Sequence, residues 1–196
     1  MTGSGDRRLV LAIAGGMVLT VVALLVAFWV ADRDSDDGAG TDAAALADAS
    51  DLSSVPDAEL EQVVAEHPGV VPMRLALVER YLRAGELESA QRHAEEAAVR
   101  AEVVEDRARA LRYLGWTTAL LGDPDQGEGL LVQSLALEPA DRDALYFLAR
   151  VRFDQLGDAA GALEPLEQLA AMDMDADQRE LIDNLLAEVR AALPAS

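Results

Sequence analysis

The chain has 196 residues, of which 51% are apolar, and a formal net charge of -20 at pH 7. This length and apolar content accommodate one soluble domain, one membrane segment and a linker. So acidic a chain is unsuited to bind nucleic acid in general or to adhere to anionic lipid, because both carry phosphate groups that need cations. It contains no cysteine, which excludes disulfides, thiolate metal sites and cysteine nucleophiles.

Residues 9–31 form a long segment without a single charge. As a helix rising about 1.5 Å per residue, the segment reaches roughly 35 Å, enough to cross the core of a bilayer. A cleaved signal peptide is the alternative, but its apolar region is usually about 7–15 residues long and is followed by small residues. Here Phe28, Trp29 and Val30 occupy that position. The sequence therefore predicts an uncleaved transmembrane helix.

The charges beside this segment predict its orientation. Arg7 and Arg8 precede it, whereas residues 32–37 contain four aspartates and the single positive charge of Arg33. By the positive-inside rule, residues 1–8 form a short cytoplasmic N-terminus and the rest of the chain lies outside the cytoplasm. We expect a single-pass protein of the cytoplasmic membrane with an extracytoplasmic C-terminal domain.

Small residues recur within the apolar segment. Ala12, Gly16 and Thr20 are spaced four apart, which lets two membrane helices approach closely. Gly and Ala are also common in membrane helices that do not associate. The spacing is therefore consistent with a homo-oligomer and equally with a monomer.

Residues 32–55 are rich in Asp, Ala, Gly and Ser and have no apolar face long enough to pack firmly. We therefore expect an acidic flexible linker. The alternating aspartates at its start invite comparison with a calcium-binding loop. That loop needs Gly at the turn, where this chain has Asp37, and Glu at the end, where it has Ala43. These departures favour the linker.

Residues 56–193 show the periodicity of helices throughout. A leading helix starts at Pro56 and stops at the sequence His67-Pro68-Gly69. Three helical hairpins follow, each with apolar residues at intervals of three and four and a glycine at its turn. They occupy residues 71–104, 111–139 and 143–170, with turns at Gly85, Gly122 and Gly157.

The last predicted helix, residues 175–193, has the two-sided character of a terminal cap. One side is apolar and the other is polar, as the outer face of the last unit in a stack needs to be. The apolar residues are Leu181, Ile182, Leu185, Leu186 and Val189, and the polar ones are Gln178, Glu180, Asp183, Asn184 and Glu188.

The hairpins resemble the tetratricopeptide repeat (TPR), a 34-residue helix-turn-helix unit with the pattern W-x2-L-G-x2-Y, Gly, A-x3-F, Ala and Pro. The middle copy matches best, because residues of the expected kind stand at the pattern's positions in order. The resemblance implies an all-α fold of about three repeats with leading and capping helices, behind one transmembrane helix. The matching residues of the middle copy are Leu111, Leu114, Gly115, Thr118, Gly122, Gly127, Leu131, Ser134 and Pro139.

The outer copies match through Leu77, Tyr81, Gly85, Ala90 and Ala97, and through Tyr146, Phe153, Gly157, Ala162 and Leu166. They also depart from the pattern. Arg74 replaces the large apolar residue that opens the first copy, and Ala149 and Arg150 replace the Leu-Gly pair of the third. Pro165 falls within the second helix of the third copy, where proline is expected to cause a kink.

A narrower resemblance concerns residues 143–193. They look like the closing part of the membrane-anchored repeat proteins of bacterial cytochrome c maturation. Those proteins hold the apocytochrome for haem attachment, so the resemblance implies a role in the assembly of exported proteins.

No motif for catalysis, a cofactor or a metal ion is present in the sequence. Neither His67 nor His93 has a partner at metal-ligand spacing. The sequence contains no glycine-rich phosphate loop and no G-x-S-x-G elbow, and no pair of carboxylates is marked as an acid and a base. We expect that the protein is not an enzyme and has no cofactor.

Stacked helical hairpins present their first helices on the concave side, where exposed residues can bind a peptide. Arg109, Arg112 and Trp116 share one side of the middle first helix and are offset from its core residues. Arg and Trp often dominate binding surfaces, and Arg can bind a carboxylate. The equivalent positions of the other copies are Glu79, Arg83, Phe147 and Asp154.

Each of these residues also has a structural alternative. Arg107, Arg109 and Arg112 have Glu102, Glu105 and Asp106 close by in the sequence as ion-pair partners. Trp116 has the alternative of packing between neighbouring copies.

Together these observations predict a membrane-anchored module that binds a protein or peptide partner. They do not predict binding to nucleic acid. We expect a role in the assembly or chaperoning of exported proteins, with cytochrome c maturation as the most specific version. The alternative is a structural adaptor or scaffold subunit of a cell-envelope complex, such as a secretion or translocon-type complex.

Overall fold

The computed structural model of the chain describes residues 55–193. The predicted transmembrane helix at 9–31 and nearly all of the predicted linker at 32–55 lie outside the described residues. None of the helices that are described is long and apolar enough to cross a membrane.

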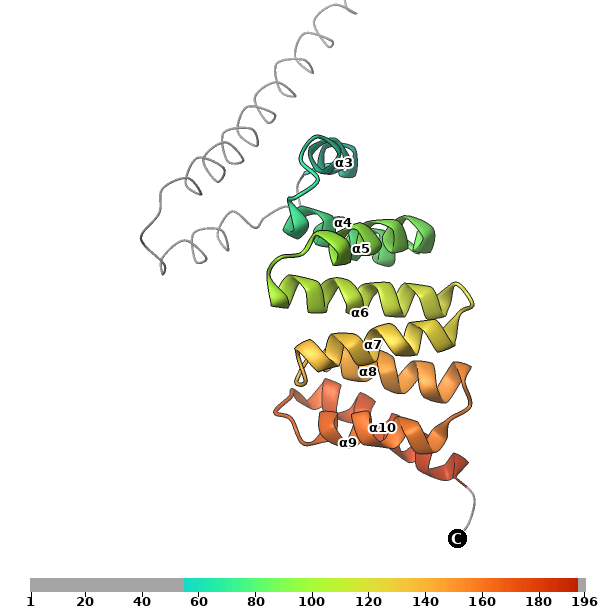
Figure 1. Cartoon of the computed structure of the whole chain (residues 1–196). Helices are drawn as coiled ribbons and strands as arrows, with labels where there is room; N and C mark the ends of the chain where they lie inside the picture. Colours follow the sequence, from blue (N-terminus) through green and yellow to red (C-terminus); the bar gives the residue numbers. More distant parts are fainter. Residues whose placement is uncertain (1–54, 194–196) are drawn as a thin grey trace, which may run out of the picture. The chain divides into compact units, whose positions relative to one another are not determined.

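The described part of the chain is built of helices and turns, with no strand among residues 55–193. The helices stack side by side in chain order, from α3 at one end to α10 at the other (Figure 1). They are α3 Asp57–Glu66, α4 Val71–Ala84, α5 Leu87–Arg100, α6 Val104–Leu120, α7 Pro124–Leu137, α8 Arg142–Arg150, the π-helical turn η2 Val151–Gln155, α9 Ala159–Ala170 and α10 Ala176–Ala192.

Three hairpins, α4–α5, α6–α7 and α8–α9, form the body of the stack, as the sequence predicts. Their turns are at Gly85, Gly122 and Gly157, with φ of 77°, 104° and 67°. Glycine alone adopts this left-handed conformation without strain from a Cβ atom. The three turn glycines therefore mark the hairpins in the sequence as well as in the structure.

The middle hairpin is the most closely packed, because glycines face each other across it. A Cβ atom added at Gly115 of α6 would lie 2.8 Å from the carbonyl oxygen of Gly127 in α7, and one at Gly127 would lie 2.7 Å from the Cβ of Ala119. Both glycines stand at pattern positions of the predicted repeat. They allow the backbones of α6 and α7 to come together without intervening side chains.

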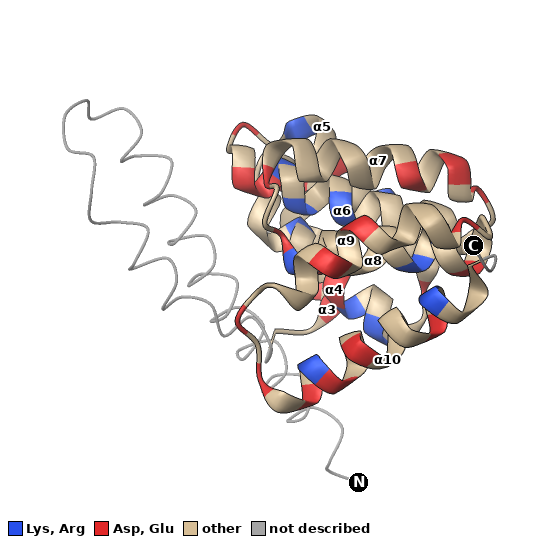
Figure 2. Ribbon diagram, turned by 90° about the horizontal axis from the view of Figure 1, so that it is seen from below, with Lys and Arg blue, Asp and Glu red and all other residues tan. Residues whose placement is uncertain are grey.

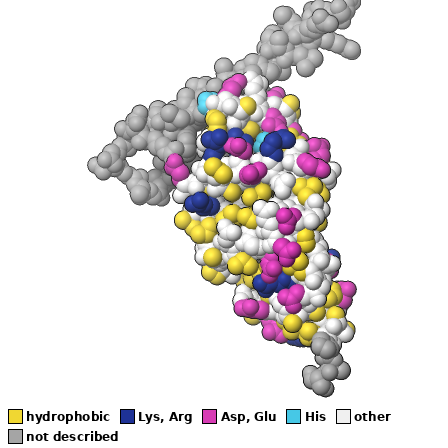
Figure 3. Space-filling model, turned by 45° about the vertical axis from the view of Figure 1, so that its right-hand side comes forward, with side chains coloured by type: hydrophobic (Ala, Val, Ile, Leu, Met, Phe, Trp, Pro, Cys, Tyr) yellow, Lys and Arg dark blue, Asp and Glu magenta, His cyan; other side chains and the backbone are white. Residues whose placement is uncertain are grey.

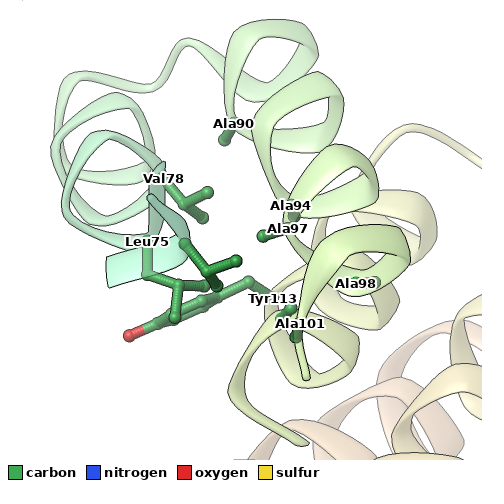
Figure 4. Packing of buried hydrophobic residues seen from close by; sticks show 10 residues of the cluster. Leu75, Val78, Ala90, Ala94, Ala97, Ala98, Ala101 and Tyr113 are labelled. Atoms are coloured by element: carbon green, nitrogen blue, oxygen red, sulfur yellow. The ribbon is translucent and has the colours of Figure 1, made fainter. Parts of the chain in front are cut away.

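In the first hairpin, small side chains on the second helix, α5, allow α4 and α5 to pack closely. Val78 of α4 lies toward Ala90 and Ala94 of α5, and Leu75 of α4 lies beside Tyr113 of α6 (Figure 4). The apolar core thus continues from one hairpin into the next.

The first helices of successive hairpins contact each other directly, α4 with α6 and α6 with α8. Contacts of similar extent are absent from the described residues between α5 and α7 and between α7 and α9. The first helices therefore lie on the closer-packed inner side of the stack, as the repeat resemblance implies.

The predicted register of the third hairpin is wrong in its first helix. Tyr146 and Phe153, which the sequence pattern places at core positions, are half-buried and pack against the core, whereas the fully buried residues are Leu145, Leu148 and Ala149. The cause is η2, where the amide of Leu156 donates to the carbonyl oxygen of Val151, five residues back, at 3.1 Å. This π turn inserts one residue between the helix and its turn glycine. Ala149 consequently takes the close-contact position held by Gly115 in the middle copy.

The two ends of the described stack are covered by helices with polar outer sides. In α10, Ile182, Leu185, Leu186 and Val189 are buried, which confirms the predicted cap. Leu181 differs from the prediction, because 53% of its surface is exposed. The predicted polar residues are all exposed: Gln178, Glu180, Asp183, Asn184 and Glu188.

Candidate protein-binding surface

Arg112, a predicted binding residue, is buried and forms an ion pair between two hairpins. Its Nη1 lies 2.8 and 2.7 Å from the two carboxylate oxygens of Asp141 and 3.3 Å from Asp143. Asp141 also caps α8, because it accepts from the backbone amide of Ala144 at 3.1 Å. The partners of Arg112 thus come from the next hairpin and not from the acidic start of its own helix. Its guanidinium is occupied within the fold.

Burial alone would lower the pKa of Arg112, but electrostatic attraction from Tyr113 and the Asp141 carboxylate outweighs burial and raises the pKa. The guanidinium also lies over the ring of Tyr113, with its central carbon 4.6 Å from the ring centroid. Arg112 therefore remains charged and fixed, with one face on an aromatic ring and its edge on a carboxylate.

Glu79, another predicted binding residue, accepts a hydrogen bond from the Tyr113 hydroxyl at 2.8 Å. Burial raises the pKa of Tyr113 to about 12, and Glu79 contributes to the increase. This hydrogen bond links α4 to α6, and the Arg112–Asp141 ion pair likewise links α6 to α8. Sequence reasoning missed Tyr113 and Asp141, because no local spacing relates either residue to its partner.

Trp116 and Phe147 lie together, although they come from different hairpins. Their rings are stacked, with centroids 4.6 Å apart and planes inclined by 9°, and Tyr146 lies at 6.1 Å from Phe147 in a tilted arrangement. The pair packs against a buried cluster that includes Leu131 and Leu148. All three aromatic side chains are half-buried. Trp116 therefore packs between copies and still presents part of its surface to solvent.

The remaining predicted residues are exposed. Asp154 of η2 pairs with Arg150, the last residue of α8, at 2.7 Å. Arg83 and Arg109 are exposed, and no described residue forms an ion pair with either. Leu120, one helical turn beyond Trp116, is 40% exposed and was not among the predicted binding residues.

We define the first-helix face by the residues on the inner helices that remain accessible to a partner. Arg83 belongs to it because it follows Glu79 by one turn of α4, and Glu79 contacts α6. The full set is Arg83, Arg109, Trp116, Leu120, Tyr146 and Phe147.

Charge is mixed over the described domain. Acidic and basic residues occur along most of its helices (Figure 2), and on the face shown in Figure 3 apolar side chains lie among charged ones. Among residues 55–193 no group of three His, Cys, Asp or Glu side chains is arranged to hold a metal ion.

Two crystal structures of MamA have a similar fold. One is 18% identical in sequence, with a TM-score of 0.53 over 68% of this chain and 84% of that chain. The other is 21% identical, with a TM-score of 0.52 over 68% of this chain and 74% of that chain. At this identity the likeness shows a shared TPR-like helical fold. No family model and no curated protein matches the sequence.

Proposed function

We infer that this protein is a TPR-type scaffold that binds a segment of another protein along the first-helix face. The observation that supports this most strongly is the pairing state of the arginines. Arg83 and Arg109 are exposed without an acidic partner in the described residues, although the chain has 36 acidic residues. They lie on the inner helices that also carry the half-exposed Trp116–Phe147 stack.

This arrangement defines the chemistry of the partner segment. The guanidinium groups of Arg83 and Arg109 are free to bind carboxylates. The aromatic stack and Leu120 supply an apolar surface of the kind on which binding energy concentrates. The partner is therefore a segment that combines acidic residues with an apolar side chain. No catalytic role is part of this proposal.

The proposed setting is the cytoplasmic membrane, with residues 9–31 as a single-pass anchor and the repeat domain outside the cytoplasm. The uncharged apolar segment and the arginines before it support this placement. Within that setting the proposed role is the assembly or chaperoning of exported proteins. The resemblance of residues 143–193 to repeat proteins of cytochrome c maturation supports that pathway as its most specific form.

A structural adaptor of an envelope complex is the second candidate. The fixed inter-hairpin links favour it, because the Arg112–Asp141 ion pair and the Tyr113–Glu79 hydrogen bond hold the inner helices in one arrangement. A preformed surface suits one folded partner. A chaperone should bind isolated C-terminal peptides or unfolded chains, whereas an adaptor should copurify with one folded complex.

Charge reversal at the two free arginines tests the binding surface. Full-length protein in detergent is used to select peptides from a random phage-displayed library, and the selected peptides are measured against variants. The R83E/R109E double variant is expected to lose at least tenfold in affinity, because two carboxylates would then face the acidic segment.

Arg107→Glu is the matched control. Arg107 is also exposed in α6 and has no ion pair with a described residue, but two residues of helix place it on nearly the opposite side from Arg109. The control should bind the selected peptides as the unmodified protein does. Equal affinity in R83E/R109E, or an equal loss in R107E, contradicts the proposed surface.

A further inference from the structure

Three helices meet at one carboxylate at the N-terminal end of the described stack. Glu61 of α3 accepts a hydrogen bond from the Tyr81 hydroxyl of α4 at 2.7 Å, and its Oε1 lies 2.9 Å from Nε2 of His93 in α5. The rings of Tyr81 and His93 are stacked, with centroids 5.6 Å apart. His93 is 3% exposed. The docking of α3 therefore covers a histidine.

The contacts of His93 determine where its proton lies. An ionised carboxylate can only accept, so Nε2 carries the proton that binds Glu61. Arg92 lies 3.4 Å from the same Nε2, but both groups then carry hydrogens and form no bond with each other. Nδ1 is buried and has no hydrogen-bond partner. The neutral ring fits this site, because its Nδ1 carries no hydrogen and leaves only an acceptor unpaired.

A second proton on His93 fits poorly. It would create a buried N–H without an acceptor, which is costly, and a cation near Arg74 of α4 and Arg92 of α5. Glu61 and Glu96 are the anions that face the ring. Burial, the largest effect, outweighs the attraction of Glu61 and lowers the pKa of His93 below its ordinary 6.5.

Residues of α4 and α5 hold α3 on the stack through one small apolar cluster and a few polar contacts, so a penalty at His93 weakens its docking. The helix has ten residues, and its apolar contact is a cluster of Leu60 and Val64 with Leu77 of α4. Arg74 donates from Nη2 to the Val64 carbonyl oxygen at 3.0 Å. Arg80 of α4 binds Asp57 and the Val55 carbonyl oxygen, each at 2.5 Å, and Arg92 lies 3.7 Å from Glu61. A helix of this length does not persist in water without packing. Release of α3 therefore means its local unfolding and the exposure of His93 to solvent.

We propose that α3 is an acid-released cap: protonation of His93, which the docked helix disfavours, opens α3 and uncovers the Leu77 and Tyr81 surface of the first hairpin. His93 bound as a neutral donor to Glu61 keeps the cap closed. The device is independent of any partner on the first-helix face.

The sign of the pH effect follows from the lowered pKa of His93. The docked state binds fewer protons than the open state, so its stability is complete above pH 6.5 and falls as the pH drops through 6.5. Glu61 acts in the same direction at lower pH, because its hydrogen bonds from Tyr81 and His93 outweigh burial and lower its pKa below 4.5.

Amide hydrogen exchange on the full-length protein in detergent tests the proposal. Protection factors, which remove the intrinsic pH dependence of exchange, are compared between pH 7.5 and pH 5.5. Protection in α3 should fall by at most about tenfold, the limit set by a histidine whose pKa is the ordinary 6.5 in the open state and is lowered in the docked state. Protection in α7, which lies in the middle hairpin, should not show the same fall. Protection in α3 that does not fall with acid overturns the proposal.

Two glutamine variants identify the group responsible. His93→Gln retains an N–H donor for Glu61 and does not titrate, so protection of α3 should become independent of pH over this range. His67→Gln is the matched control, because His67 ends α3, is exposed and should leave the pH dependence intact. The same acid-induced loss in His93→Gln overturns the proposal.

An NMR titration of the two histidines in the unmodified protein covers the case in which His93→Gln does not fold. Protonation of His93 should coincide with the loss of protection in α3. A His93 that takes up its second proton while the α3 amides stay protected overturns the proposal as well.

Discussion

Arg152 donates a hydrogen bond to the carbonyl oxygen of Gly161 at 2.9 Å, and this bond explains how Pro165 is tolerated inside α9. Proline has no N–H and therefore leaves the carbonyl four residues earlier, that of Gly161, without its helical partner. Arg152 supplies the missing donor and also binds Glu128 of α7 at 2.6 Å. Arg152 therefore replaces the backbone hydrogen bond that is lost at Pro165, the residue at which the sequence predicts a kink.

A double-mutant cycle tests this compensation. Arg152→Ala should destabilise the protein by about 1–3 kcal/mol, since it leaves a partly buried carbonyl and Glu128 without a donor. In a Pro165→Ala background the backbone amide of residue 165 can serve the Gly161 carbonyl, so the cost should be smaller. The free energy of unfolding in urea measures both, and equal costs in the two backgrounds contradict the explanation.

The glycine contact in the middle hairpin predicts a difference between neighbouring glycines of α7. Gly127→Ala should destabilise by about 1–3 kcal/mol, because its Cβ would overlap Ala119 and the Gly115 carbonyl. Gly129→Ala is the control, since no atom lies within 4 Å of its Cβ position. It should stabilise the protein by up to about 1 kcal/mol through helix propensity. Urea unfolding that ranks the two variants the other way contradicts the close approach of α6 and α7.

Alanine variants of Arg112 and Arg109 should affect different properties, the first the stability of the fold and the second the binding of peptide. Arg112→Ala leaves Asp141, whose side chain is 6% exposed, without its partner and should cost about 3 kcal/mol in unfolding free energy. Arg109→Ala should change stability by less than about 0.5 kcal/mol, as exposed substitutions usually do, while weakening peptide binding. Circular dichroism in urea and peptide titration of both variants provide the measurement. A stable Arg112→Ala protein contradicts the role of the ion pair.

The hairpins and both end helices could be predicted from the sequence because their signals are local. A left-handed turn restricts the choice to glycine at residues such as Gly122, and the two-sided pattern of residues 175–193 follows from helix geometry. The register of α8 was not predictable in this way, because a π turn adds one residue without a residue type that marks it.

The candidate surface was only partly predictable for a related reason. The sequence places Arg112 on the same side of its helix as Arg109, and the structure agrees. Its partner Asp141 is 29 residues away, so the choice between a free and a paired arginine depended on how the hairpins stack. The stacking of Trp116 on Phe147 is non-local in the same sense, although both residues were predicted to share the surface.

Fluorescence of Trp116 during peptide titration tests the proposed binding surface most directly. The chain has two tryptophans, so a Trp29→Phe background leaves Trp116 as the reporter. A selected acidic and apolar peptide should change the emission saturably in this background and in Arg107→Glu, and not in R83E/R109E at the same concentrations. A peptide that binds by calorimetry without any change in Trp116 emission would show that the partner lies elsewhere on the protein.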